Sequence, residues 1–289
     1  MQQLTIRFLG TSASRPIPRW GCDCPQCTAS KMAPHGERTR PSILINSSIL
    51  VDTGPDIYRQ LNRLPYEALG LIDHIIISHP HADHYMGLDD LAGLRRISRL
   101  PVLPIYAPSD GWDRIWSAFR YLIASEASEY DRRPFARRAM RMGEPLAFDD
   151  GLVITPLDTH HTQVFTTAGL LIEQYGRSLF YASDFHYIDS GALADVEVLV
   201  LDGSFLTQKE ADRRYTPHPE EGQGRHLPML RGLQWGHQVG ARRIVFTHLG
   251  HVGLTDQELI SRLADPVCTL AHDGMAINLP ANCEEICLA

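Results

Sequence analysis

The stretch IIISHPHADH, residues 75 to 84, constrains the fold of this chain more than any other segment. Three isoleucines lead directly into four side chains of the kind that bind metal ions, which are His79, His81, Asp83 and His84. A short run of β-branched apolar residues is typical of a strand that is buried on both faces. Each imidazole or carboxylate buried there without a partner would cost roughly several kcal/mol. The fold must therefore supply partners at the end of this strand.

The spacing of these four residues fits two neighbouring metal ions better than one. His79 and His81 are two residues apart, so their rings can point the same way in an extended loop. Asp83 and His84 are adjacent and stand at a predicted helix start, where a negative side chain is favourable. Four protein ligands on one tetrahedral ion would leave no open position for chemistry. We therefore expect two metals that each take part of the cluster.

Composition and charge limit the partners of the chain. Its 289 residues are enough to bury a substantial core, and 44% hydrophobic with 21% charged residues is ordinary for a globular protein. The net charge is −7, from 27 basic and 34 acidic residues, so no overall field attracts nucleic acid or an anionic membrane. A small anionic substrate would need a local positive site, such as a bound metal.

The sequence gives no sign of export. The N-terminal MQQLTIRFLG lacks the basic leader and long apolar run of a signal peptide, and no stretch approaches the ~18 apolar residues of a membrane span. We expect a cytoplasmic protein. Cys22, Cys24 and Cys27 lie within six residues, and in a reducing compartment such clustering indicates a metal site rather than disulfides.

Strand-like segments outnumber helix-like ones, and the two types alternate only in part. This pattern predicts an α/β domain in which helices cover sheets. No linker or low-complexity segment divides the chain, so we expect residues 1–289 to form a single domain. Within it we expect a Cys-rich insert at about 20–28 and a helical insert at about 111–142.

The pattern His-X-His-X-Asp-His at residues 79–84 resembles the metal-binding motif of the metallo-β-lactamase superfamily. The rest of that family's pattern has counterparts in order, in TPLDTHHT, FYASDF and VFTHLGH. The resemblance runs from Phe8 to HDGMAI at 272–277 and so covers nearly the whole chain. It implies a four-layer αββα sandwich of two mixed β-sheets, with helices on both outer faces and ligands in loops along one edge.

The resemblance also implies two divalent metals, zinc or manganese, and a ligand set for each. One metal would take His79, His81 and His161, the second would take Asp83, His84 and His248, and the carboxylate of Asp184 would bridge them. Either histidine of the doublet His160–His161 could be the third-strand ligand, and the count from the preceding Thr-Pro favours His161. The strand-end aspartate of the family, here Asp52, would support the metal loop through hydrogen bonds.

The segment WGCDCPQC, residues 20–27, narrows the resemblance. Three thiols at this spacing can wrap one zinc, which needs a fourth ligand. The insert is similar to an extra zinc site in two branches, the phosphodiesterase that opens phosphoribosyl 1,2-cyclic phosphate and the pyrroloquinoline quinone biosynthesis protein B group. In the first branch the fourth ligand is a histidine three residues after the last active-site histidine. This implies a closed, structural zinc site of Cys22, Cys24, Cys27 and His251.

The intact histidine motif favours the hydrolase branch, because the quinone-biosynthesis group usually has a degraded motif. In the phosphodiesterase a histidine 22 positions before the last active-site histidine serves the phosphate and the leaving group, and here that position is His226. The resemblance thus implies hydrolysis of a small cyclic or nucleotide-like phosphodiester by a hydroxide held between the metals. Asp83, Asp184 and His226 would be the catalytic residues.

Other functions stay open on the sequence. A thioesterase or lactonase of the same fold would use the same centre, although it has less use for His226. An RNA-processing nuclease fits poorly with the net charge and with the lack of a long basic arm. A metal-binding carrier or assembly factor fits poorly with the intact motif.

The expected partner is a small phosphorylated substrate, without nucleic acid or membrane, and the similar phosphodiesterase implies a homodimer. The basic run at 132–141, RRPFARRAMR, is either a solvated helix face or part of a lid over a phosphate.

Overall fold

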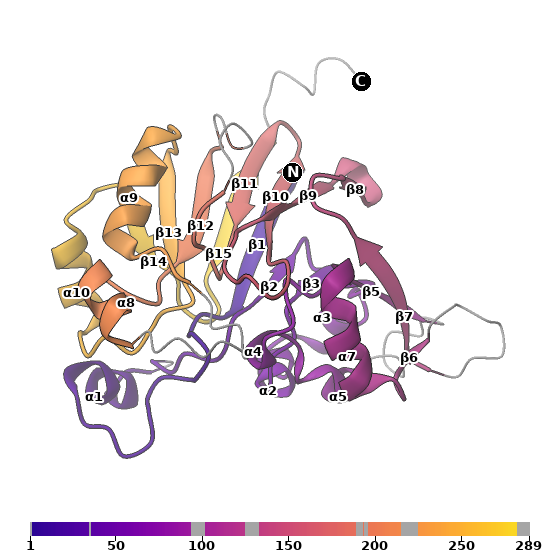
Figure 1. Ribbon diagram of the computed structural model, residues 1–289, viewed down its shortest axis with the longest axis horizontal. Coiled ribbons are helices and arrows are strands. Elements are labelled where there is room, and N and C mark those ends of the chain that lie inside the picture. Colours follow the sequence, from indigo (N-terminus) through magenta and orange to yellow (C-terminus); the bar gives the residue numbers. More distant parts are fainter. Residues whose placement is uncertain are drawn as a thin grey trace.

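Two mixed β-sheets packed face to face form the centre of the computed structural model (Figure 1). The structure describes residues 2–34, 36–93, 102–124, 133–188, 193, 196–214 and 225–281. Both sheets combine parallel and antiparallel strands, and helices lie on their outer sides.

The first sheet has eight strands and is built mainly from the N-terminal half of the chain. Antiparallel pairs join its first four strands, and parallel pairs join the others. Its spatial order is β15 (Ala276–Pro280), β1 (Gln3–Gly10), β2 (Ser42–Ile45), β3 (Ile49–Val51), β4 (His74–Ile76), β5 (Leu103–Pro108), β7 (Phe135–Met140) and β6 (Ile123–Ala124).

The second sheet has seven strands from the C-terminal half. Its first four strands are parallel, and the remaining pairs are antiparallel. Its spatial order is β14 (Cys268–Leu270), β13 (Arg243–Thr247), β12 (Val198–Asp202), β11 (Arg177–Tyr181), β10 (Ala168–Gln174), β9 (Val153–Asp158) and β8 (Leu146–Ala147).

Helices cover the outer face of each sheet (Figure 1). The first sheet carries α2 (Ile57–Leu61), α3 (Tyr66–Leu69), α4 (Ala82–Tyr85), α5 (Leu88–Leu91) and α7 (Trp112–Phe119). The second carries α8 (Gln208–Arg214), α9 (Met229–Gln238) and α10 (Asp256–Leu263). The remaining described α-helix, α1 (Pro25–Met32), lies in the Cys-rich insert, and two short 3-10 helices span Ser109–Gly111 and Asp149–Gly151. None of the described helices has the length and apolar character needed to cross a membrane.

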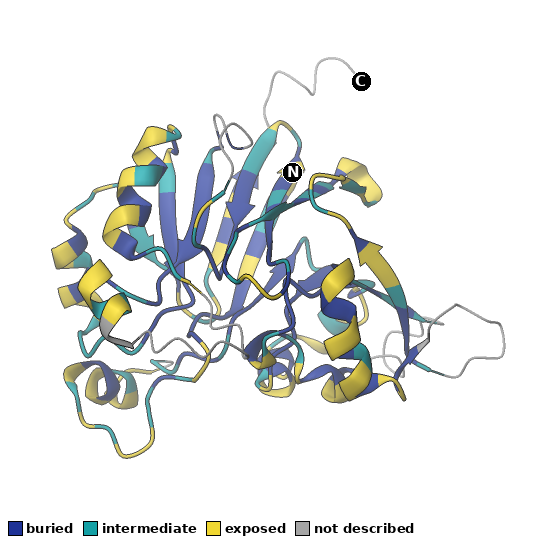
Figure 2. Ribbon diagram, viewed as in Figure 1, coloured by how far each residue is buried: buried dark blue, intermediate teal, exposed yellow. Residues whose placement is uncertain are grey.

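Three hydrophobic cores separate the four layers. One core lies between the sheets, one between the first sheet and its helices, and one between the second sheet and its helices. Figure 2 shows the result, since the strands are mostly buried while the helices expose their outer sides. The predicted αββα sandwich is therefore confirmed.

Strand β4 shows why the isoleucine run has its composition. Ile76 packs into the core between the sheets, whereas Ile75 and Ile77 pack into the core beneath the helices. The side chains alternate between the two cores because successive side chains point to opposite faces of a strand. All three are fully buried. The strand is buried on both faces, as its sequence predicts, and two residues separate its end from His79, where the histidine motif begins.

The expected helical insert at 111–142 is wrong for residues 135–140. Helix α7 ends at Phe119, and Phe135–Met140 form strand β7, which pairs in parallel with β5. Pro134 disfavours helical backbone in the residue before it, and pairing with β5 outweighs the helix preference of the alanine, arginine and methionine residues that follow. Residues 125–132 lie outside the described part of the chain.

Substitutions in β4 test the double burial. We expect Ile75→Ala and Ile76→Ala each to lower the free energy of unfolding by about 2–5 kcal/mol, because each leaves a cavity in a different core. Leu71→Ala is the control, since Leu71 is 58% exposed and its loss should change stability by less than about 0.5 kcal/mol. Urea unfolding measures the free energy of unfolding of all three variants. A loss below about 0.5 kcal/mol for either isoleucine, as at a surface position, would contradict burial on that face of the strand.

Candidate metal centre

The carboxyl ends of strands from both sheets converge at one edge of the sandwich. Residues 78–84 follow β4 and Asp52 follows β3, both in the first sheet. His161 follows β9, Asp184 follows β11 and His248 follows β13, all in the second sheet. Because β9 and β11 both pair antiparallel with β10, their carboxyl ends lie at the same edge as that of β13.

The predicted ligands meet there in two sets. The donor atoms of His79, His81 and His161 lie within 4.8 Å of one another. Those of Asp83, His84 and His248 form a second set with the same spread. The fold thus brings together residues from both halves of the chain, although the sequence places His79 and His248 far apart.

Asp184 lies between the two sets. Its Oδ1 is 3.4 Å from Nε2 of His161, and its Oδ2 is 3.0 Å from Nε2 of His84 and 3.5 Å from Nε2 of His248. One carboxylate oxygen therefore faces each set, which is the arrangement that a bridging ligand requires.

Hydrogen bonds from behind orient the histidines. In four of them Nδ1 is engaged at 2.8–3.0 Å, so that Nε2 faces the centre. The four pairs are His79 with Ser78 Oγ, His84 with Asp52 Oδ2, His161 with the Arg225 carbonyl and His248 with Ser204 Oγ. Such partners fix the ring orientation and the tautomer of metal-binding histidines. His81 instead presents Nδ1, which lies 2.8 Å from Nε2 of His79.

Asp52 is the central support of the motif. It is fully buried and accepts hydrogen bonds from the Ser78 backbone N–H (2.8 Å), the Ser78 hydroxyl (2.9 Å) and His84 Nδ1 (2.8 Å). Two residues later, a Cβ on Gly54 would lie 2.0 Å from the carbonyl oxygen of Asp83. Only glycine allows the VDTG turn to pack so closely against the metal loop.

Charge and burial set the protonation of the cluster. Burial lowers the pKa of His161 to about 3 and also lowers that of His79, so both rings are neutral, as metal ligands must be. Burial also acts to raise the pKa of Asp184, but His248, His84 and His161 outweigh it and hold that pKa well below its usual range. Burial lowers the pKa of His248, yet Asp184 and its other carboxylate partners raise it to about 10. A metal ligand must be neutral, so protonation of His248 and metal binding compete at this residue.

Two buried atoms in the centre lack hydrogen bonds. His84 Nε2 and Asp184 Oδ2 lie 3.0 Å apart, but neither has a partner with hydrogen-bonding geometry. Leaving a buried donor or acceptor unpaired is costly, and a metal ion between them would satisfy both atoms. Imidazole and carboxylate donors suit zinc and manganese. The residues present therefore fit divalent metal ions.

The structure separates the two histidines of the doublet. His161 is buried and belongs to the set with His79 and His81. His160 is half-buried, stacks on Tyr187 with ring centroids 4.2 Å apart, and lies 3.5 Å from the carboxylate of Asp158. Only His161 is placed to bind a metal with the first set.

His226 lies next to the centre and is held by an aspartate that the sequence analysis missed. Its Nδ1 is 2.5 Å from Oδ2 of Asp202 and 4.0 Å from Oδ1 of Asp184. Burial acts to lower the pKa of His226, but Asp202 and then Asp184 outweigh it and raise that pKa above its usual value. The signal for Asp202 was present in VLVLD, an apolar strand that ends in aspartate, as ILVD does at Asp52.

A pocket of about 420 Å³ opens over the centre. Its wall includes Asp83, Asp184, His226 and other members of the cluster. Loop residues 13, 14 and 19 from the N-terminal region also line it, together with His251. This volume suits a small molecule rather than a polymer.

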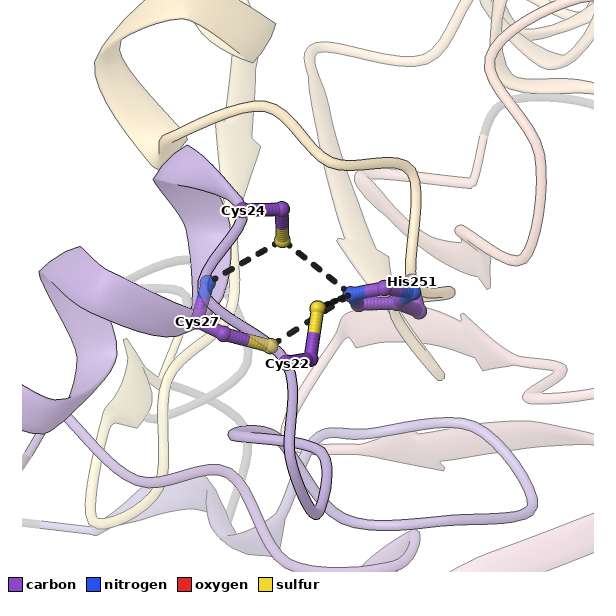
Figure 3. A group of neighbouring side chains, drawn as sticks. All are labelled: Cys22, Cys24, Cys27 and His251. Carbon is purple, nitrogen blue, oxygen red and sulfur yellow. Dashed lines mark hydrogen bonds between the residues drawn. The ribbon is translucent and has the colours of Figure 1, made fainter.

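The three clustered cysteines form a second candidate metal site (Figure 3). The Sγ atoms of Cys22, Cys24 and Cys27 lie 3.5, 3.2 and 3.3 Å from Nε2 of His251, and all four side chains converge. Zn–S bonds of about 2.3 Å and Zn–N bonds of about 2.0 Å at tetrahedral angles separate such ligands by about 3.5 Å. The donor set therefore fits one tetrahedral zinc with no open position.

The described arginines of the basic run lie outside the pocket. Arg137 stacks over the ring of Trp112, with 5.1 Å between the guanidinium carbon and the ring centroid. Arg141 pairs with Glu144 at 3.6 Å, and both side chains are exposed. These contacts favour a solvated surface over a lid, although the surface belongs to β7 and not to a helix. Arg132 lies outside the described residues.

Comparison with known families shows to which superfamily the chain belongs. Residues 47–249 match a family described as "Beta-lactamase superfamily domain". The chain belongs to this superfamily. The match spans the histidine motif, Asp184 and His248, so the predicted family is confirmed.

Two curated relatives of the chain carry different names. The coenzyme PQQ synthesis protein B of Cupriavidus necator is 26% identical over 315 residues, which cover 95% of this chain and 99% of that protein. The octanoyltransferase of Porphyromonas gingivalis is 26% identical over 273 residues, which cover 93% of this chain. The match covers 50% of the octanoyltransferase, so the chain spans about half the length of that relative.

Solved structures match along nearly the full chain. A diphosphatase from the PhnP family has a TM-score of 0.76 and 26% identity, covering 96% of this chain and 98% of its own. Zn²⁺-bound PqqB from Methylobacterium extorquens has a TM-score of 0.71 and 20% identity, covering 95% and 100%. The short form of human tRNase Z has a TM-score of 0.63 and 20% identity, covering 96% and 99%. The last two show the shared fold alone.

Asp52→Asn tests the support of the metal loop. The amide keeps the shape of the side chain but loses the charge and one acceptor, so we expect the zinc affinity of the histidine–aspartate centre to fall about 10–100-fold. Chelator competition measures this affinity. Asp73→Asn is the matched control, because Asp73 also contacts a histidine, His74 at 2.7 Å, but outside the centre. Equal affinities in the two variants would show that Asp52 does not support the site.

Proposed function

We propose that the protein is a metal-dependent phosphodiesterase acting on a small cyclic or nucleotide-like phosphodiester. The superfamily fold and the donor set support a metal-dependent hydrolase. The observation that carries the choice of phosphodiester is His226, which Asp202 holds at 2.5 Å beside the metal-binding carboxylate of Asp184. A cationic imidazole in this position attracts an anionic phosphoryl group of a substrate more strongly than it attracts a neutral carbonyl group.

The proposed centre is binuclear. His79, His81 and His161 would hold one ion, Asp83, His84 and His248 the other, and Asp184 would bridge them. Two divalent ions there would supply Lewis-acid charge for the phosphoryl oxygens and lower the pKa of a water molecule. The hydrogen bonds between the histidine Nδ1 atoms and Ser78, Asp52, the Arg225 carbonyl and Ser204 keep the rings oriented, so little reorganisation accompanies the reaction.

His226 is the proposed general acid. Asp202 engages Nδ1, which leaves Nε2 as the nitrogen that can act on a substrate. Burial acts to lower the pKa of His226, but Asp202 and Asp184 outweigh it and raise that pKa, so the protonated ring that a general acid requires is favoured. It would stabilise the charge that develops on the phosphoryl oxygens and then protonate the departing alkoxide.

The comparisons support chemistry at phosphorus. The PhnP-family diphosphatase has 26% identity with the chain over nearly the whole of both proteins, and its name denotes cleavage of a phosphorus compound. The size of the pocket, about 420 Å³, and the net charge of −7 support a small phosphorylated substrate over nucleic acid.

Turnover by the metal-loaded protein tests the proposal. We expect hydrolysis of 2′,3′-cyclic AMP and bis(p-nitrophenyl) phosphate to exceed that of a thioester and a lactone, and Asp184→Ala to abolish it. His226→Ala should lower turnover of the cyclic nucleotide by about 10²–10⁴-fold, because an alkoxide needs a proton to depart. The loss should be smaller for bis(p-nitrophenyl) phosphate, since nitrophenolate leaves without one.

The matched control is His237→Ala. His237 also pairs with an aspartate, Asp265 at 2.6 Å, but it is exposed and lies outside the pocket. Its loss should leave both rates unchanged. Preferred cleavage of the thioester or lactone, with His226→Ala silent, would replace the proposed substrate class with a carbonyl ester.

A further inference from the structure

We infer that a second pocket beside His226 binds a nucleobase, so that the favoured substrates are nucleotides whose base lies on the side of the departing alkoxide. The inference rests on the proposed function and names the substrate class of the same site. It follows from where this pocket lies, from how its walls are held and from the hydrogen-bonding groups that line it.

The second pocket has a volume of about 210 Å³, and we call it the side pocket. The polar and aromatic side chains on its wall are His186, Phe205, Gln208, Asp212, Arg225 and His226. Phe205 and His226 also line the pocket over the metal centre, so the two pockets adjoin at these rings. Because His226 is the proposed general acid, the group that it protonates must lie against it. The side pocket is the space next to His226 that can hold the rest of that group.

The walls of the side pocket are tied to the metal centre. The main chain of Arg225 forms two hydrogen bonds with His161, since its N–H donates to the His161 carbonyl and its carbonyl accepts from His161 Nδ1 at 2.8 Å. His186 stands two residues after Asp184, and its N–H donates to the Thr159 carbonyl at 3.1 Å. Residues next to predicted metal ligands thus build the side pocket, which limits the entropy lost when it binds a ligand.

Two side chains of the side pocket have polar atoms that are free for a ligand. Nδ1 of His186 is a buried atom without a hydrogen bond. No hydrogen bond or ion pair joins the guanidinium of Arg225 to another residue in the described part of the chain. Leaving a buried polar atom unpaired is costly, so a ligand that pairs with His186 is favoured.

Acceptors lie on helix α8 at the same pocket. Nε2 of Gln208 donates to Oδ1 of Asp212 at 2.8 Å. This contact orients both side chains and leaves the amide oxygen of Gln208 and the second carboxylate oxygen of Asp212 as acceptors. The side pocket therefore offers both donors and acceptors, together with the ring of Phe205.

This mixture of groups identifies the ligand. A nucleobase carries donors and acceptors along its edges, and its faces stack on aromatic rings and on guanidinium planes. The carboxylate of Asp212 would repel a phosphate, and a purely apolar group would leave the polar atoms of the pocket unpaired. A nucleobase uses the cation of Arg225, the ring of Phe205 and the acceptors of α8 at once.

Two cyclic phosphodiesters that differ in the base alone test this inference. They are 2′,3′-cyclic AMP and methyl β-D-ribofuranoside 2,3-cyclic phosphate, in which a methoxy group replaces adenine. The metal-loaded wild type should have a KM about tenfold to a hundredfold lower for cyclic AMP, as expected for a stacked and hydrogen-bonded base. His186→Ala, Arg225→Met and Gln208→Ala should each reduce this preference by about twofold to tenfold, because each removes one contact with the base.

Arg231→Met is the matched control, because Arg231 is an exposed arginine of α9 that does not line the side pocket. It should keep the wild-type preference. Elemental analysis shows whether each variant retains its metal, and Gln208→Ala, at an exposed position of α8, decides if the other two do not. A wild-type KM for cyclic AMP that is no lower than that for the ester without a base would overturn the inference. A preference that survives in every variant with metal retained would overturn it too, and in both cases the phosphodiesterase proposal stands.

If the wild type cleaves neither ester, the proposed function fails and binding decides about the side pocket. Calorimetry then compares adenosine with methyl β-D-ribofuranoside. Tighter binding of adenosine that is weakened in Gln208→Ala and unchanged in Arg231→Met supports a base site in the side pocket. Equal affinities in the wild type, or a preference for adenosine that Gln208→Ala keeps, overturn it.

Discussion

The buried carboxylate of Asp52 is the contact on which the site depends. It joins the end of β3 to the start of the histidine loop after β4, through two hydrogen bonds from Ser78 and one from His84. A fully buried charge is tolerated only when it is well paired. Asp52 therefore fixes the loop, and the buried isoleucines fix the strand before it. The metal-binding atoms gain their positions from both.

Buried aspartates at strand ends also hold histidines in the second sheet. Asp184 follows β11 and Asp202 ends β12, and both face histidines from other segments. Aspartates from three strand ends thus hold a ring of imidazoles at the edge where the two sheets meet. Within this ring His84 Nε2 and Asp184 Oδ2 are left without hydrogen bonds, and a divalent cation between them would satisfy both atoms.

Much of this arrangement could be predicted from the sequence, and the reasons are local. The isoleucine run predicts a doubly buried strand, and the spacing of His79 to His84 predicts a shared metal site. The sequence could not predict β7, because alanine, arginine and methionine favour a helix and only pairing with β5 makes them a strand. The apolar strand VLVLD indicates that an aspartate ends a buried strand, but the sequence alone does not show that Asp202 pairs with His226, because the two residues meet only in the folded chain.

The two candidate metal sites share one wall of the pocket and have different chemistry. The cysteine cluster is closed, so its effect on the pocket is to position His251, Arg19 and the loop around them. The histidine–aspartate centre has bridging geometry and opens to the pocket. The cysteine cluster thus holds the loop that borders the pocket, and the histidine–aspartate centre faces the pocket itself.

Anomalous X-ray diffraction from crystals of the zinc-loaded protein tests the central claim most directly. The account predicts three zinc peaks, with two beside Asp184 about 3.5–4 Å apart and one among Cys22, Cys24, Cys27 and His251. A single peak in the histidine–aspartate centre would contradict the binuclear site, and no peak among the cysteines would contradict the structural zinc.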